Sequence, residues 1–227
     1  MRLRNIPEAK GVVAESGYVI HPDMDEILTS ETLFGRNLPL AVEIGMGKGG
    51  FILGMAAQHP ETGFLGVERY ESVLFKAIRK MEELDEAGTA PDNVRFYCVD
   101  AGLLPMHLAP ESVDVLYLNF SDPWPKARHH KRRLTSREFL AVYEKFLKKG
   151  GRLEFKTDNE ALFDFSLEEI GETPGWTLTG VTRDLHRDPV LSEGNVMTEY
   201  ERKFSLLGSR ICKLTAVREG GMMQEKV

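Results

Sequence analysis

Short apolar runs alternate along this chain with longer segments in which apolar residues recur with the period of an α-helix. The apolar runs predict five strands, at residues 38–45, 64–68, 93–100, 112–120 and 151–158. The periodic segments predict helices at residues 51–59, 70–88, 135–148 and 159–170. Because strands that alternate with helices build a mostly parallel sheet with helices on both faces, the pattern predicts a doubly wound α/β fold.

The pattern changes in the last quarter of the chain. Residues 176–185 and 198–217 contain strand-like apolar runs with no long helix between them. We expect them to form an antiparallel pair at one edge of the sheet, which would then have seven strands. Thr198, Tyr200 and Glu201 would lie at the entrance of such a strand.

One predicted helix carries a start signal in the sequence. Thr135 stands before the apolar period of residues 135–148, and Glu138 follows three residues later. A Thr at the N-cap and a Glu three residues on can satisfy two free backbone amides reciprocally. We therefore expect a capping box at this helix start.

Composition narrows the class of protein. The 227 residues fit one large domain, and a hydrophobic content of 42% is enough for a sizeable core. The N-terminus lacks the apolar segment of a signal peptide, and no apolar run is long enough to cross a bilayer. Cys98 and Cys212 lie far apart, which argues against a disulfide framework and a thiolate metal site. We expect a cytoplasmic protein in a reducing compartment.

Acidic residues stand at the ends of the predicted strands. They are Glu43, Glu68, Asp100, Asp122 and Asp158. In an open parallel sheet, ligands bind in the crevice beyond the carboxyl ends of the strands. A single carboxylate there is explained equally well as a cap or a turn residue. Five on one edge predict a binding crevice.

The loop EIGMGKGG between the first predicted strand and helix fits two kinds of cofactor site. Gly45, Gly47 and Gly50 satisfy the G-x-G-x-x-G pattern of dinucleotide-binding proteins. Gly45, Gly47 and Gly49 equally satisfy the acidic-x-G-x-G-x-G pattern of S-adenosylmethionine-dependent methyltransferases. Glu43 would repel a pyrophosphate but would pair with the ammonium group of S-adenosylmethionine. The charge favours a methyltransferase, and a nicotinamide-dependent oxidoreductase is the alternative.

The segment NFSDPWPKARHHKRR, at residues 119–133, contrasts with the formal net charge of -6. Its last eight residues contain five Lys or Arg and two His. A basic cluster on an acidic protein is typical of a local phosphate-binding surface, because the acidic remainder discourages binding elsewhere. A solvated loop without a partner is the alternative. The two His have no other metal-ligand residues near them in the sequence, so we expect no metal.

This segment, together with VEIGMGKGG, GVE, FKTDN and TEYERKF, resembles the bacterial tRNA (guanine-N7-)-methyltransferase family from about residue 38 to 206. The resemblance implies a class I, Rossmann-like methyltransferase fold with a seven-stranded, mostly parallel sheet and an antiparallel C-terminal edge strand. It implies methyl transfer from S-adenosylmethionine to N7 of a guanine in the tRNA variable loop. Residues 38–207 would form the catalytic domain, between an N-terminal extension at 1–37 and a C-terminal segment at 208–227.

The resemblance also implies site residues. Cofactor contacts are implied for Glu43, Gly45, Gly47, Glu68, Asp100 and Asp122. Substrate contacts are implied for Lys126, Asp158, Thr198, Glu199, Tyr200 and Glu201. RNA contacts are implied for Arg128, His129, His130, Lys131, Arg132 and Arg133. S-adenosylhomocysteine would be the product, and no metal, membrane or obligate protein partner is implied.

The chemistry of guanine agrees with these assignments. N7 has an in-plane lone pair and no proton, so the enzyme must mainly align the reactants. Asp122 lies beside Pro123 and Pro125, whose rings restrict the backbone, and we expect it to be catalytic by positioning the cofactor and offsetting the charge on guanine. Asp158 can accept from guanine N1–H and the N2 amine, or it can cap a helix. Trp124 can stack on a base or pack on the core.

Two further alternatives to this function stay open. One is a methyltransferase that acts on another RNA. The other is a non-catalytic RNA-binding protein on the same fold.

Overall fold

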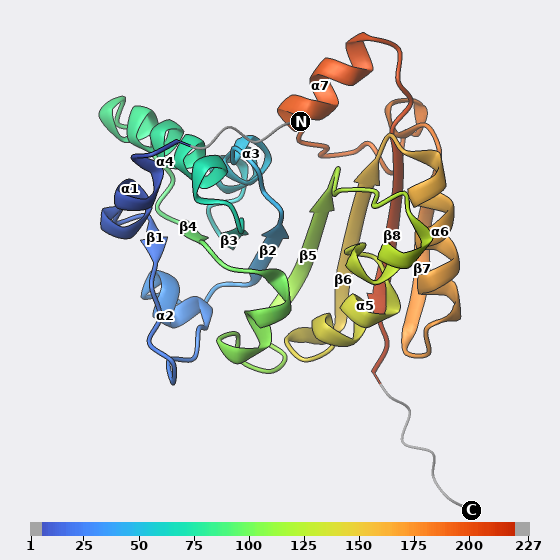
Figure 1. The fold of residues 1–227 in the computed structure, drawn as a ribbon, viewed down its shortest axis with the longest axis horizontal. Coiled ribbons are helices and arrows are strands. Elements are labelled where there is room, and N and C mark those ends of the chain that lie inside the picture. The colour runs from blue at the N-terminus through green and yellow to red at the C-terminus, as the bar shows by residue number, and fades with distance from the viewer. Residues whose placement is uncertain (1–5, 221–227) are drawn as a thin grey trace, which may run out of the picture.

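The structure is a computed structural model that describes residues 6–220. Its centre is one sheet in the order β1-β4-β3-β2-β5-β6-β8-β7, which Figure 1 shows from edge to edge. The strands are β1 Val19–Ile20, β2 Leu40–Ile44, β3 Gly63–Val67, β4 Val94–Tyr97, β5 Val113–Asn119, β6 Leu147–Thr157, β7 Trp176–Thr182 and β8 Cys212–Arg218. Neighbouring strands are parallel except where β8 pairs with β6 and β7. The predicted doubly wound α/β fold is confirmed.

Helices cover both faces of the sheet and bury two apolar clusters. The helices are α1 Ala9–Glu15, α2 Ser30–Phe34, α3 Gly50–Gln58, α4 Glu71–Glu86, α5 Arg137–Tyr143, α6 Glu160–Glu172 and α7 Glu199–Leu206, with 3-10 helices η1 Ala101–Met106, η2 Ala127–Arg132 and η3 Leu185–Arg187. The first cluster joins α1, α3 and α4 to the sheet, and the second joins α2, η1, α5 and α6. Within residues 6–220, no helix is long and apolar enough to span a membrane.

The sheet has one strand more than the seven we expected. Val19 pairs with Phe96, so the short β1 extends the sheet beyond β4. A two-residue strand carries no apolar run that a sequence pattern can detect. At the other side, β8 lies between β6 and β7, so the antiparallel strand stands one place inside the edge. The predicted extensions at 1–37 and 208–227 lie partly outside the described residues.

The helix predicted at residues 135–148 is shorter in the structure. α5 ends at Tyr143, and β6 already begins at Leu147. The carbonyl of Phe146 accepts from the amides of Ser112 and Val113, and Leu147 pairs with Val113. At this end of α5, strand pairing with β5 therefore replaces the helix that the apolar period predicted.

The predicted capping box at the start of α5 is wrong. Ser136 occupies the N-cap without a side-chain bond, and the Thr135 hydroxyl instead pairs with Ser166 Oγ at 2.7 Å inside the core. The amide of Arg137 donates to Glu169 Oε2 of α6 at 2.7 Å. A carboxylate from a neighbouring helix thus satisfies the free amide that a local cap would have taken.

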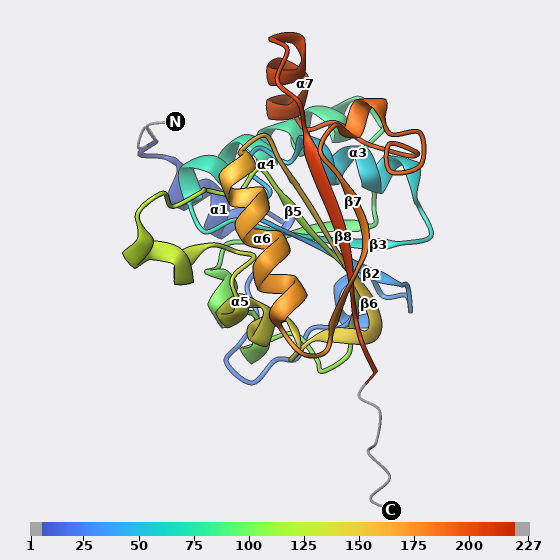
Figure 2. The same cartoon turned by 90° about the vertical axis from the view of Figure 1, so that its right-hand side faces the viewer.

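The predicted strand entrance at Thr198 is also wrong, because these residues start α7. Thr198 is the N-cap, and its side chain accepts from the amide of Glu201 at 2.9 Å. The sequence T-E-Y-E carries the T-x-x-E signature of a helix start, which would have predicted this element. Figure 2 shows that α7 projects beyond the carboxyl edge of the sheet.

Candidate functional site

The candidate site lies where the carboxyl ends of β2, β3, β4, β5 and β6 meet. Parallel register aligns these ends, with Glu43 opposite Gly66 and Asn119 opposite Lys156. Asp122 comes three residues after Asn119, and Asp158 comes two residues after Lys156. The fold therefore brings the carboxylates of separate strands to one edge, as the sequence predicts.

The glycine loop between β2 and α3 needs its glycines for their backbone geometry. Gly45, Gly47 and Gly49 have φ of 74°, 61° and 74°, the left-handed region that costs other residues roughly 1–2 kcal/mol. The amide of Gly45 donates to Val67 of β3, which ties the loop to the next strand. A Cβ on Gly49 would come 3.0 Å from the Cβ of Ala77 in α4.

Glu43 is a buried carboxylate with one free oxygen. Its Oε1 accepts from Asn119 Nδ2 at 2.8 Å, while its Oε2 has no hydrogen-bond partner among the described residues. Burial raises the pKa of Glu43 to about 7, and the bond from Asn119 and the charge of Lys156 hold it from rising further. A cation that pairs with Oε2 would stabilise the ionised form.

Glu68 connects the ends of β2 and β3. Its Oε2 accepts from the amide of Gly47 at 3.2 Å, and its Oε1 accepts from the amide of Tyr70 at 3.1 Å. Burial raises the pKa of this carboxyl, whereas these amides favour the charged form. Each oxygen keeps a lone pair that can accept from a hydroxyl group of a ligand.

Asp100 and Asp122 both act on Arg69 through their charge. Asp100 caps η1 through the amide of Gly102 at 3.0 Å, and its Oδ2 is 3.7 Å from Arg69 Nη1. The pKa of Arg69 is raised by its bond to Tyr70, and the charges of Asp100 and Asp122 add to that rise. Asp122 itself is exposed and follows β5 directly, so its carboxylate is open to a ligand.

Asp158 is free of the capping role that the sequence allowed. Asn159 caps α6 instead, and its Oδ1 accepts from the amide of Leu162 at 2.8 Å. Asp158 Oδ2 accepts from the hydroxyl of Tyr200 at 3.0 Å. Burial and this bond raise the pKa of Tyr200 to about 12, so the phenol remains a donor at neutral pH.

An aromatic cluster surrounds this hydrogen bond. The ring of Tyr200 lies 4.9 Å from that of Phe120 and stacks on Phe204 at 4.1 Å. Phe120 has φ of 53°, an uncommon conformation for a bulky residue, and it directly precedes the S-D-P-W-P turn. Aromatic rings thus border the Asp158 carboxylate, and such rings provide faces on which an unstacked nucleobase can stack.

A buried ion pair that sequence reasoning missed connects α7 to the sheet. Lys156 Nζ donates to Glu201 Oε2 at 2.7 Å, with side chains only 4% and 0% exposed. His186 Nε2 and Asn195 Nδ2 lie 3.0 and 2.8 Å from Glu201 Oε1. Burial opposes ionisation of both partners, and their mutual attraction keeps the pKa of Glu201 below its usual value. A lysine within the apolar strand RLEFKTD was the available signal, since a buried ammonium needs a carboxylate.

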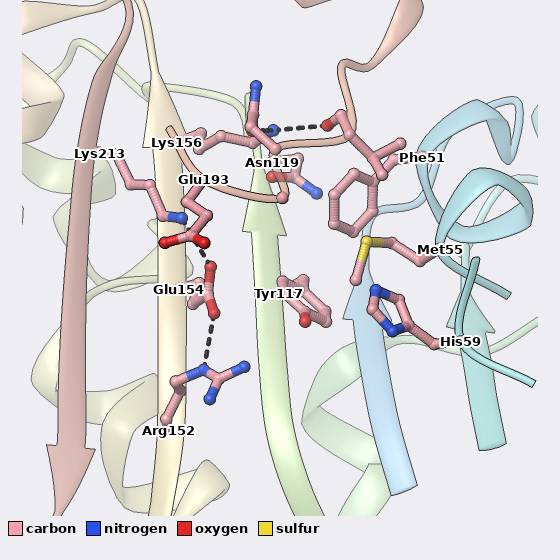
Figure 3. Close-up of a pocket in the computed structure, with 13 residues that line it drawn as sticks. Phe51, Met55, His59, Tyr117, Asn119, Arg152, Glu154, Lys156, Glu193 and Lys213 are labelled. Carbon is pink, nitrogen blue, oxygen red and sulfur yellow. Dashed lines mark hydrogen bonds and ion pairs between the residues drawn. The ribbon is translucent and has the colours of Figure 1, made fainter. Parts of the chain in front are cut away.

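Lys156 of this ion pair also lines a pocket of about 230 Å³ between α3 and the 193–196 segment. Figure 3 shows Phe51, Met55 and Tyr117 on one side and the charged chain of Arg152, Glu154 and Lys213 on the other. Asn119 and Lys156, at the carboxyl ends of β5 and β6, line the pocket, and the glycine loop does not. The chemistry described above therefore lies beside this pocket.

The basic segment forms η2 and packs around Trp124. Arg132 lies over the Trp124 ring at 5.1 Å, and His129 meets it edge-on at 5.6 Å. Trp124 has φ of 41°. Lys126, Arg128, Lys131 and Arg132 are exposed.

Arg133 differs from the other cations of this segment. It is 8% exposed and donates to the carbonyls of Pro123 and Trp124 at 2.9 and 3.2 Å. Its guanidinium also lies 4.3 Å from the ring of Phe165. In this arrangement Arg133 holds the D-P-W-P turn in place, and its charge is not presented to solvent.

The residues at the strand edge fit S-adenosylmethionine. The free, buried Oε2 of Glu43 suits an ammonium group, and the carboxylate of Glu68 suits ribose hydroxyls. The pyrophosphate of a dinucleotide would face the buried Glu43 instead, which argues against that alternative. Among residues 6–220, no group of three or more His, Cys, Asp or Glu side chains could hold a metal ion.

Comparisons with known proteins agree with this chemistry. A family model described as "Putative methyltransferase" matches residues 37–214. The tRNA (guanine-N(7)-)-methyltransferase of Lachnoclostridium phytofermentans is 50% identical over 96% of this chain and 99% of that protein. The tRNA (guanine-N(7)-)-methyltransferase of Bacillus subtilis is 44% identical over 93% of this chain and 96% of that protein.

Solved structures support the fold at low sequence identity. The 16S rRNA methyltransferase KamB has a TM-score of 0.60 with 18% identity, over 89% of this chain and 99% of that one. The 16S rRNA (adenine(1408)-N(1))-methyltransferase from Catenulisporales acidiphilia has a TM-score of 0.61 with 16% identity, over 90% and 97%. Because the family model and the sequence relatives extend over most of its length, the chain belongs to the tRNA (guanine-N(7)-)-methyltransferase family.

Proposed function

We infer that this protein transfers a methyl group from S-adenosylmethionine to N7 of a guanine in the variable loop of tRNA. The observation that carries the proposal is the pair of carboxylates, Asp122 and Asp158, at the ends of the adjacent parallel strands β5 and β6. One lies on the side of the Glu43 cofactor crevice, and the other borders the aromatic cluster around Tyr200.

The chain's own task in this reaction is alignment. S-adenosylmethionine, when bound, supplies an electrophilic methyl group on a sulfonium. Guanine N7 needs no base, because it carries a lone pair and no proton. Asp122 is exposed at the crevice beside Arg69, where its carboxylate can orient the cofactor and offset positive charge on the methylated ring. Holding two reactants in attack geometry is worth roughly 7–11 kcal/mol.

Guanine recognition falls to Asp158. Its Oδ2 accepts from Tyr200, and its Oδ1 remains to accept from N1–H or the N2 amine of guanine. Adenine presents no such donor pair on this edge. The base must be unpaired or flipped out of its stack to expose the edge, as sequence-specific RNA recognition commonly requires.

The other implied substrate residues divide into two groups. Thr198 and Glu199 start α7 beside Tyr200, with Glu199 in an ion pair with Lys80 of α4, and Lys126 is exposed at the start of η2. Both carboxylate oxygens of Glu201 form hydrogen bonds within the protein. We therefore propose that Glu201 holds α7 in position and does not contact the nucleotide.

The exposed cations of η2 are the proposed contact with tRNA phosphates, since phosphate contacts dominate RNA affinity. Because the proposed substrate is tRNA, we propose the cytoplasm as the location of the protein. The proposal needs no obligate protein partner and leaves the oligomeric state open.

Methyl transfer from labelled S-adenosylmethionine to unmodified tRNA transcripts tests the function. We expect label in 7-methylguanosine after digestion to nucleosides, and loss of label when the variable-loop guanine is changed to adenine. Label in another nucleoside would indicate a methyltransferase for a different RNA position. Absence of label with tRNA still bound would indicate a non-catalytic RNA-binding protein.

A further inference from the structure

Helix α7 presents an uncompensated positive surface beside the substrate site. Its sequence EYERKFSL contains two acidic and two basic residues. Both acids have a cationic partner, because the exposed Glu199 pairs with Lys80 at the surface and the buried Glu201 pairs with Lys156. Arg202 and Lys203 are exposed.

The two cations have no competing partner. In the part of the chain that the structure describes, neither Arg202 nor Lys203 lies within 4.0 Å of a carboxylate, although many other surface cations are paired in this way. Because Lys80 and Lys156 balance the charges of Glu199 and Glu201, the exposed face of the helix carries the net positive charge of Arg202 and Lys203. On a protein of formal net charge -6, this is a second local exception, besides η2.

Lys203 is tied directly to the aromatic cluster. Its Nζ lies 5.6 Å from the ring centroid of Phe204, and Phe204 stacks on Tyr200 at 4.1 Å. Tyr200 and Lys203 are three residues apart, so they share a helix face. Because Tyr200 donates to Asp158, a cation on this face lies next to the place where the target nucleotide is recognised.

The geometry of an RNA strand calls for cations at more than one place. A nucleotide in the site has one phosphate on its 5′ side and one on its 3′ side, so the backbone leaves in two directions. In both ribbon views, α7 (orange-red) lies beyond the carboxyl edge of the sheet, and η2 (yellow-green) stands well apart from it, near α5 and α6. The cations of η2 can therefore reach only part of the strand.

We propose that α7 is a second RNA-binding element, in which Arg202 and Lys203 contact backbone phosphates next to the target guanine. This rests on the proposed tRNA substrate and extends it by a surface outside the basic segment at residues 126–133. In this arrangement, the aromatic side chains of α7 contact the base of the nucleotide, and the cations of α7 contact its phosphates. The ion pairs of Glu199 with Lys80 and of Glu201 with Lys156 offset the acidic charge of the helix.

The salt dependence of tRNA binding tests this surface. The variant R202A/K203A removes two charges, and K145A/K149A removes two exposed charges, one from the turn before β6 and one from the first residues of β6, at the opposite end of the sheet. Equilibrium binding of an unmodified tRNA transcript is measured from 0.1 to 0.5 M salt. We expect R202A/K203A to reduce the slope of log affinity against log salt by about 1.4, equivalent to about 25-fold weaker binding at 0.1 M. K145A/K149A keeps the wild-type slope.

A charge-preserving variant separates contact from folding. R202K/K203R retains both charges and is expected to keep the wild-type slope. An unchanged slope in R202A/K203A, or an equal loss in K145A/K149A, overturns the proposal. If the wild type binds tRNA but transfers no methyl group, the proposed function fails, while the slope comparison still decides the role of α7. If the wild type does not bind tRNA, both fail.

Discussion

Glu43 and Asp158 are both carboxylates at strand ends, yet burial suits them to different ligands. Glu43 is 2% exposed and its free oxygen faces no donor in the described chain, so a positive group would relieve the cost of its charge. Asp158 is half-buried and already accepts from Tyr200. It therefore suits a neutral donor edge such as that of guanine.

The pKa of Glu43 predicts a pH dependence of cofactor binding. Its folded pKa is raised to about 7, so the free protein holds a proton there that must leave before an ammonium group can pair. We expect the affinity for S-adenosylhomocysteine to rise as pH increases from 5.5 to 7, by up to roughly tenfold per pH unit. Isothermal titration calorimetry measures this. The variant E43Q should bind weakly with a flat profile, and an equally steep profile in E43Q would contradict the assignment.

Replacement of Asp122 tests its role in alignment. The exposed carboxylate anchors no described hydrogen bond, so D122A should fold normally. We expect turnover to fall by about 10²-fold while tRNA affinity changes little, because the lost interaction acts at the reacting centre. Single-turnover methyl transfer and equilibrium binding separate the two effects, with D122N as a control of shape. Equal losses of turnover and affinity would show that Asp122 only binds tRNA.

Inosine tests the contact of Asp158 with the base, because inosine lacks the N2 amine but keeps N7. For the wild type, a tRNA with inosine at the target position should be methylated about ten- to a hundredfold less efficiently than the guanine form, which is roughly the 1–3 kcal/mol of one specific base contact. In D158N this preference should largely disappear. If D158N keeps the full preference, another residue reads the amine.

At the scale of elements, α7 owes its position to one buried ion pair. Lys156 and Glu201 connect β6 to the helix, and β6 ends next to Asp158. The same pair forms hydrogen bonds with His186 of η3 and with Asn195 from the segment before α7. Asp158 and the Tyr200 side chain that donates to it are thus held by a common support.

Breaking this pair should destabilise the protein strongly. K156M leaves the carboxylate of Glu201 buried without its counterion, which costs roughly 3–5 kcal/mol. Urea denaturation measures the change in unfolding free energy. The control R210M breaks the exposed pair with Glu160 and should cost less than about 1 kcal/mol. The double variant K156M/E201M should recover much of the loss, and a K156M that is as stable as R210M would contradict this role.

At the scale of the whole molecule, the contrast between an acidic protein and local basic surfaces sets how tRNA binds. Four exposed cations remain in the basic segment after Arg133 is set apart: Lys126, Arg128, Lys131 and Arg132. If each neutralises a phosphate, they contribute about -3 to the slope of log affinity against log salt.

Alanine at all four positions should remove this contribution, as measured by tRNA binding at several salt concentrations. R133A is the matched control, because its buried guanidinium anchors the D-P-W-P turn. We expect R133A to keep the slope and to lose turnover through displacement of Asp122. A slope that falls only in R133A would reverse the two assignments.

Sequence reasoning succeeded where one local signal or one topological rule was sufficient. Strand and helix alternation predicted the parallel sheet, and parallel strands place their carboxyl ends together, so the acidic edge followed. The predictions were wrong at Thr198, where a local helix-start signal was taken for a strand, and where two elements competed. The end of α5 gave way to pairing with β5, and the capping function of Thr135 went to Glu169 of the neighbouring helix.

The composition and motifs of the chain were sufficient to predict its fold class, its glycine loop and its acidic edge. Each of these features depends on residues close in sequence or on strand direction. Whether a charge serves a ligand or the fold was decided in three dimensions. Lys156 and Glu201 are 45 positions apart, and Arg133 reaches back to Pro123 across the turn. A charged side chain takes the partner that packing places beside it, because burial makes an unpaired charge too costly to leave.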